Sequence, residues 1–191
     1  MDLSSFSAQL PRGDFWVFGY GSLMWSPDFS HAERRPAFLR GYHRSLCILS
    51  HRYRGTPDQP GLVMGLCRGG SCWGVAFRVA ERQAMAALAA LWEREMSGRV
   101  YHPRLVPVVI ARARRVRALA FVADTAHTNF TRSLSVADTA RMIAEGRGQR
   151  GHNIEYLEQT LAHMDELGVR DRRLHQVMGM VRALRDSTPR R

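Results

Sequence analysis

Lysine is absent from this chain of 191 residues, so all 28 basic residues are arginine and the net charge at pH 7 is +11. The arginines are spread along the chain, and no RNA-recognition, helix-turn-helix or zinc-finger signature accompanies them. The charge therefore indicates a solvated arginine-rich surface, or attraction for small anionic substrates, more than a nucleic-acid partner.

Cysteine is scarce, and long apolar runs are missing. The three cysteines, an odd number, argue against a disulfide framework and fit a reducing compartment. They have no companion ligands at a metal-binding spacing, so we expect no metal site. No apolar run approaches the roughly 20 residues of a membrane span, and no signal peptide is evident. We expect a cytoplasmic protein without a membrane partner.

The order of the predicted elements favours an α+β fold, because strands come mostly first and helices later. The predicted strands cover residues 15–18, 37–49, 62–67, 72–79, 102–110 and 118–123. The predicted helices cover 81–96, the stretch between Ser135 and Gly146, a stretch from about Asn153, and 174–184. A hairpin is expected across Gly69-Gly70. Residues 1–13 are predicted to be a flexible arm, 14–185 a single domain and 186–191 a basic tail.

The first predicted strand ends in a loop with two glycines, Gly19-Tyr20-Gly21-Ser22. Two glycines around one residue let the backbone turn sharply and approach a ligand with its N–H groups exposed. The loop is therefore suited to a carboxylate or phosphate, although a tight turn without a ligand explains the same residues. A nucleotide loop is not indicated, because the third glycine and a Gly-Lys-Ser/Thr sequence are both missing.

The predicted helix 81–96 carries one carboxylate on its apolar face. Glu95 lies seven residues after Leu88 and four after Leu91, so at about 3.6 residues per turn it points with them, whereas Glu93 points away. Burial would raise the pKa of such a carboxyl group toward the range of a general base. The alternative is that Glu95 pairs with an arginine at the helix end.

A second group of polar residues begins the helix that starts near Asn153. His152, Glu155 and Tyr156 follow a second glycine-rich loop, residues 146–151, and are placed to face a site. Helix starts attract polar residues in any case, so both interpretations stay open.

Several segments in this order resemble the ChaC-like family of glutathione-specific γ-glutamylcyclotransferases, over about residues 15–167. The segments are Val17–Trp25, Arg40–Tyr42, Tyr53–Thr56, Gly70–Ala76, Arg94–Met96, Tyr101 and Gly151–Leu157. The stretch after Glu95, Ser97 to Tyr101, resembles the bacterial branch of the family.

This resemblance implies a mixed β-barrel with flanking helices, and an enzyme that converts glutathione to 5-oxoproline and cysteinylglycine without metal or cofactor. It implies that Glu95 is the catalytic glutamate and that Tyr156 is a weaker substrate-binding candidate. It implies a substrate-binding loop made of Val17, Phe18, Gly19, Tyr20, Gly21 and Ser22. Two alternatives are a cyclotransferase for other γ-glutamyl peptides or amines, and a non-enzymatic basic protein that binds RNA or another acidic partner. The sequence does not fix the oligomeric state.

Overall fold

The computed structural model describes residues 2–132 and 134–187, without the side chain of Arg112. The chain forms two compact units. The first, here called the barrel unit, contains Met1–Arg44 and Leu66–Asp124. The second, here called the helical unit, contains Ser45–Gly65 and Thr125–Arg191. The predicted domain boundaries stay a prediction.

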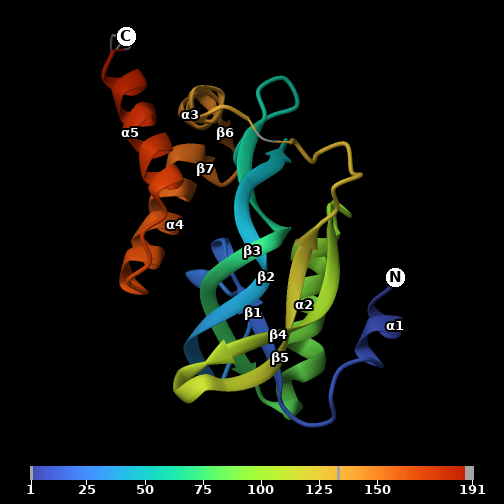
Figure 1. Ribbon diagram of the computed structural model, residues 1–191. Helices are drawn as coiled ribbons and strands as arrows, with labels where there is room; N and C mark the ends of the chain where they lie inside the picture. Colours follow the sequence, from blue (N-terminus) through green and yellow to red (C-terminus); the bar gives the residue numbers. More distant parts are fainter. Residues whose placement is uncertain (1, 133, 188–191) are drawn as a thin grey trace. The chain divides into compact units, whose positions relative to one another are not determined.

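Five strands close into a barrel in the order β1-β3-β2-β4-β5 (Figure 1). They are β1 (Phe15–Gly19), β2 (Glu33–Ser50), β3 (Gly61–Val79), β4 (Tyr101–Ile110) and β5 (Arg114–Ala123). β1 runs antiparallel to β3 and parallel to β5, so the barrel is mixed. The predicted α+β fold with a mixed β-barrel is confirmed.

The hairpin predicted at Gly69-Gly70 is wrong. β3 continues from Gly61 to Val79 as a single strand (Figure 1). Gly69 and Gly70 have φ angles of +93° and +69°, and glycine inside a strand often marks a bend or bulge instead of a reversal. The connection between β2 and β3 is the loop of residues 51–60.

The helix that carries Glu95 packs on the core of the barrel unit. A 3-10 turn, η2 (Glu81–Gln83), leads into α2 (Ala84–Met96), where Leu88 and Leu91 are fully buried. Met85, in the first turn of α2, is 59% exposed. A short helix, α1 (Leu3–Ser7), lies within the segment expected to be a flexible arm, and its Phe6 is buried in the same core.

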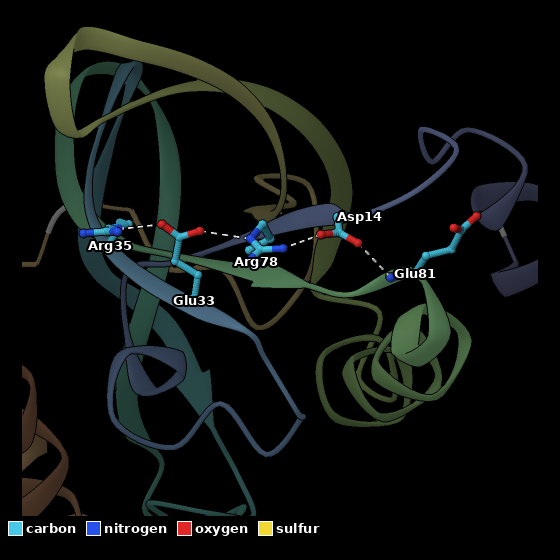
Figure 2. A network of polar contacts seen from close by, with 5 residues as sticks. All are labelled: Asp14, Glu33, Arg35, Arg78 and Glu81. Carbon is cyan, nitrogen blue, oxygen red and sulfur yellow. Dashed lines mark hydrogen bonds and ion pairs between the residues drawn. The ribbon is translucent and has the colours of Figure 1, made fainter.

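A chain of polar contacts connects η2, the turn that leads into α2, to the barrel strands, as Figure 2 shows. The Asp14 carboxylate accepts a hydrogen bond from the backbone N–H of Glu81 at 3.0 Å and another from Arg78. Arg78 also donates to Glu33 at 2.9 Å. The Glu81 N–H and Arg78 lower the pKa of Asp14, and Arg35 and Arg78 lower the pKa of Glu33. One arginine thus links two strands to the beginning of η2.

The helical unit contains α3 (Val136–Glu145), α4 (Asn153–Glu166) and α5 (Arg172–Asp186), with the short strands β6 (Arg147–Gly148) and β7 (Gly151–His152). The Ser135 side chain caps α3 by accepting from the N–H of Asp138 at 3.0 Å, as its sequence predicts. Asp186, the first residue of the predicted basic tail, belongs to α5, and residues 188–191 lie outside the described residues. No helix in the described ranges is long and apolar enough to cross a membrane.

Candidate active site

The predicted substrate-binding loop, Val17–Ser22, covers the end of β1 and the three residues that follow it in the barrel unit. Val17 and Phe18 are fully buried, so the loop can offer a ligand backbone groups, not these two side chains. Gly21 precedes the 3-10 turn η1 (Ser22–Met24). The buried hydroxyl of Tyr20 donates to the Phe121 carbonyl oxygen at 2.6 Å, which fastens the loop to β5.

Close backbone packing explains two of the glycines near this loop. A Cβ atom at Gly19 would lie 3.0 Å from Leu23 Cβ. A Cβ atom at Gly74, on the neighbouring strand β3, would lie 2.8 Å from Phe18 Cζ and would also meet the Gly19 carbonyl oxygen. The backbones of β1 and β3 therefore approach each other this closely only without a side chain at Gly74, and the turn into η1 leaves little room for one at Gly19.

Arg94 brings the loop and Glu95 together. Its guanidinium donates to Ser22 Oγ at 2.9 Å, and its Nε lies 3.1 Å from Glu95 Oε1. It also binds the Ser26 carbonyl and the Asp28 carboxylate. A single side chain thus joins η1, the segment that follows it and the end of α2.

Glu95 shows the low exposure expected of the apolar face and also the arginine partner expected at the helix end, and its role as a general base stays a prediction. Its side chain is only 15% exposed, and it pairs with an arginine at the helix end. Glu93 is exposed, as its position on the helix predicts. Sequence reasoning assigned no role to Arg94, and the only signal for it was its place directly before Glu95.

Tyr156 belongs to the helical unit, whereas the loop and Glu95 belong to the barrel unit. It is buried, and its hydroxyl accepts a hydrogen bond from the backbone N–H of Met64 at 3.1 Å. Arg54 lies over its ring at 5.9 Å and pairs with Glu155 at 3.1 Å. The Tyr156 hydroxyl therefore supports β3, and its contact with a substrate stays a prediction.

Among the described residues, no group of three or more His, Cys, Asp and Glu side chains is placed to hold a metal ion. The cofactor-free reaction implied by the resemblance stays a prediction. What the barrel unit offers chemically is a largely buried carboxylate, oriented by an arginine, beside a glycine-containing loop. Such an arrangement can accept a proton and return it next to a bound polar group.

Comparison with known proteins first defines the class of fold. The solved structure of a yeast γ-glutamyl cyclotransferase specific to glutathione matches with a TM-score of 0.83, over 90% of this chain and 97% of that chain. At 21% sequence identity, this match shows that the two share the γ-glutamylcyclotransferase-like fold.

The particular family follows from the sequence comparisons. The model of the ChaC-like protein family matches residues 15–184, and the chain belongs to that family. The glutathione-specific γ-glutamylcyclotransferase of Escherichia coli (strain K12) is 34% identical, over 91% of this chain and 75% of that protein. The human glutathione-specific γ-glutamylcyclotransferase 1 is 37% identical, over 79% of this chain and 72% of that protein. The predicted family is confirmed.

Proposed function

We propose that this protein is a glutathione-specific γ-glutamylcyclotransferase in which Glu95 transfers the proton. The observation that carries the proposal is the contact of one guanidinium, that of Arg94, with both Ser22 of the loop and the largely buried Glu95. Membership of the ChaC-like family, with relatives named as glutathione-specific γ-glutamylcyclotransferases, supports the choice of substrate.

The reaction needs one proton acceptor and no covalent intermediate. The α-amine of the γ-glutamyl group attacks its own side-chain carbonyl carbon and closes a five-membered lactam. The C–N bond to the cysteinyl nitrogen then breaks, which yields 5-oxoproline and cysteinylglycine. At neutral pH the α-amine is mostly protonated, so the attacking nitrogen loses two protons on its way from –NH3+ to the lactam N–H. Glu95 accepts them one after the other and returns them to the leaving nitrogen, which ends as the –NH3+ of cysteinylglycine. The step involves no net proton and no change of oxidation state.

Arg94 supports this role through position. The ion pair at 3.1 Å restricts where the Glu95 carboxylate lies. Positioning matters because a group displaced by about 1 Å can lose roughly a hundredfold in rate.

The loop Val17–Ser22 holds the substrate curled through its backbone. The N–H groups around Gly19 and Gly21 are proposed to bind the α-carboxylate or the oxyanion that develops on the attacked carbonyl. Ring closure between groups of one substrate can reach effective molarities on the order of 10⁵ M or more, so orientation supplies much of the acceleration. Tyr156 is kept as a weaker substrate-binding candidate.

Glutathione is the proposed small-molecule partner, and we expect neither a nucleic-acid nor a membrane partner. The arginine-rich chain, with a net charge of +11, favours approach by an anionic tripeptide. We propose a cytoplasmic location, where thiols are kept reduced.

Product analysis with two substrates tests the proposal. The purified protein is incubated with reduced glutathione or with γ-glutamyl-alanine, and the products are separated and quantified. We expect 5-oxoproline and cysteinylglycine in equal amounts from glutathione, and much slower release from γ-glutamyl-alanine. Equal turnover of both substrates would select the broader cyclotransferase. No product from either, with salt-sensitive retention on nucleic acid, would select the non-enzymatic alternative.

A further inference from the structure

One guanidinium nitrogen of Arg44, a residue of β2, is buried without a hydrogen-bond partner among the described residues. This atom is Nη1. Nη2 donates to the Trp73 carbonyl and lies 3.5 Å from Cys72 Sγ. Leaving a buried charged N–H group unpaired is costly, so such a group in a native protein calls for a functional explanation.

Other largely buried arginines have carboxylate partners. Arg94 pairs with Asp28 and Glu95, and Arg54 pairs with Glu155. Arg44 makes no ion pair with any described residue. Its positive charge is therefore not balanced by a carboxylate of the described residues.

Strand order places Arg44 close to the candidate loop. The β3 strand lies between β1 and β2 in the barrel. Trp73 of β3, whose carbonyl accepts from Arg44, directly precedes Gly74, which packs against Phe18 and the Gly19 carbonyl. The Arg44 guanidinium therefore binds the residue directly before Gly74, and Gly74 packs against the start of the loop.

We propose that Arg44 binds a carboxylate of the substrate beside the loop Gly19–Ser22. This inference rests on the proposed function, because glutathione carries two carboxylates, one on the γ-glutamyl group and one on the glycine. An N–H of a guanidinium forms strong charge-assisted hydrogen bonds with a carboxylate, and the buried Nη1 can make one without giving up the contact of Nη2 with Trp73. Arg44 is a binding residue and takes no part in proton transfer.

Calorimetric titration of reduced glutathione into the Glu95→Gln protein tests this binding without turnover. The Arg44→Gln and Arg44→Lys changes are added to that protein, with Arg68→Gln, an exposed arginine of β3, as the control of equal charge. We expect Arg44→Gln to raise the Kd roughly tenfold to a hundredfold. Arg44→Lys keeps the charge without the planar geometry and should fall between, and Arg68→Gln should stay within about twofold.

Glutathione monoethyl ester, blocked at the glycine carboxylate, identifies which carboxylate is bound. If the ester binds equally well with and without Arg44→Gln, the partner is the glycine carboxylate. If the ester loses as much affinity as glutathione, the partner is the γ-glutamyl carboxylate. Equal Kd values for Arg44→Gln and Arg68→Gln would overturn the inference, as would a lower thermal midpoint with an unchanged Kd. Should Arg44→Gln fail to fold, Arg44→Lys against Arg68→Gln decides in the same way.

The two proposals fail separately. If the wild-type protein turns over glutathione but Arg44→Gln leaves the Kd unchanged, only the role of Arg44 is refuted. Absence of 5-oxoproline from the wild-type reaction removes the proposed function and this inference with it.

Discussion

Replacing Arg94 by glutamine removes the guanidinium that holds Ser22 and Glu95 together. The change leaves four acceptors without their shared donor: Ser22 Oγ, the Ser26 carbonyl, the Asp28 carboxylate and the Glu95 carboxylate. Because Glu95 and Ser22 of the loop both contact this side chain, we expect both stability and turnover to fall.

The loss of stability can be worked from the exposure of each partner. The Asp28 side chain is 51% exposed, so its pair with Arg94 contributes little, in the range of about 0–1 kcal/mol. The hydrogen bonds to Ser22 and Ser26 contribute about 1 kcal/mol each. The loss of the arginine beside Glu95, whose side chain is 15% exposed, costs about 1 kcal/mol more. Together these effects amount to about 3 kcal/mol, or a decrease in Tm of roughly 6–12 °C for a chain of this length.

Turnover separates positioning from simple destabilisation. At a temperature well below the Tm of the variant, we expect kcat for glutathione to fall at least tenfold, because the carboxylate is no longer held in place. Arg94→Lys keeps the charge but cannot reach all four acceptors at once, so it should recover part of kcat. Arg104→Gln, an exposed arginine on β4, is the control. A kcat for Arg94→Gln equal to that of the control, or a loss no larger than the unfolded fraction, would refute the positioning role.

Three further predictions concern the scaffold. Gly74→Ala should destabilise the protein by about 1–3 kcal/mol in urea unfolding, because the new Cβ would lie 2.8 Å from the buried ring of Phe18. The control is Gly179→Ala, which should stabilise α5 because a Cβ there meets nothing within 4 Å. Equal effects of the two changes would contradict the close packing at Gly74. Folding lowers the pKa of Asp14 and of Glu33, the two carboxyl groups that pair with Arg78 in Figure 2. Their contribution to stability is therefore present above the unfolded-state pKa and is lost as the pH falls through the folded-state pKa. Urea midpoints should therefore decrease below about pH 4.5, less steeply in Arg78→Gln, and parallel curves would count against the network. Tyr156→Phe should lower the free energy of unfolding by about 1–2 kcal/mol, since the Met64 N–H loses its hydrogen-bond acceptor. If the hydroxyl also binds substrate, the KM for glutathione should rise as well. An unchanged KM would mean that the hydroxyl has a structural role only.

Local signals predicted the starts of α3 and α4 well, although they missed α1. Ser135, with Asp138 three residues later, marks the start of α3, and Gly146 marks its end as a cap. Asn153 begins α4 as expected. These predictions succeeded because capping depends on residues a few positions apart, which the sequence shows directly.

Long-range pairing was harder to predict. Gly69-Gly70 looks like a hairpin turn when read alone, yet β3 passes through it without reversing. Whether two glycines reverse a strand or bend it depends on the partner strand, here β2, whose residues lie some 30 positions earlier. The parallel pairing of β1 with β5 likewise joins residues about 100 positions apart, and no local pattern indicates it.

The candidate site was predicted in part. Helical spacing indicated that Glu95 differs from Glu93, and the structure shows that difference in exposure. The contact of Arg94 with Ser22 spans 72 positions, and the unpaired Nη1 of Arg44 appears only after folding. In a chain with 28 arginines and no lysine, composition does not distinguish these two from the rest.

Release of 5-oxoproline from reduced glutathione by the Glu95→Gln and Glu93→Gln variants tests the role of Glu95 most directly. Both changes remove one carboxylate from α2, but Glu93 is exposed and Glu95 is largely buried beside Arg94. With both variants folded, as judged by circular dichroism, Glu95→Gln should lose about a hundredfold or more in kcat and Glu93→Gln less than about twofold. Equal activity in the two variants would contradict the assignment of Glu95 as the residue that moves the proton.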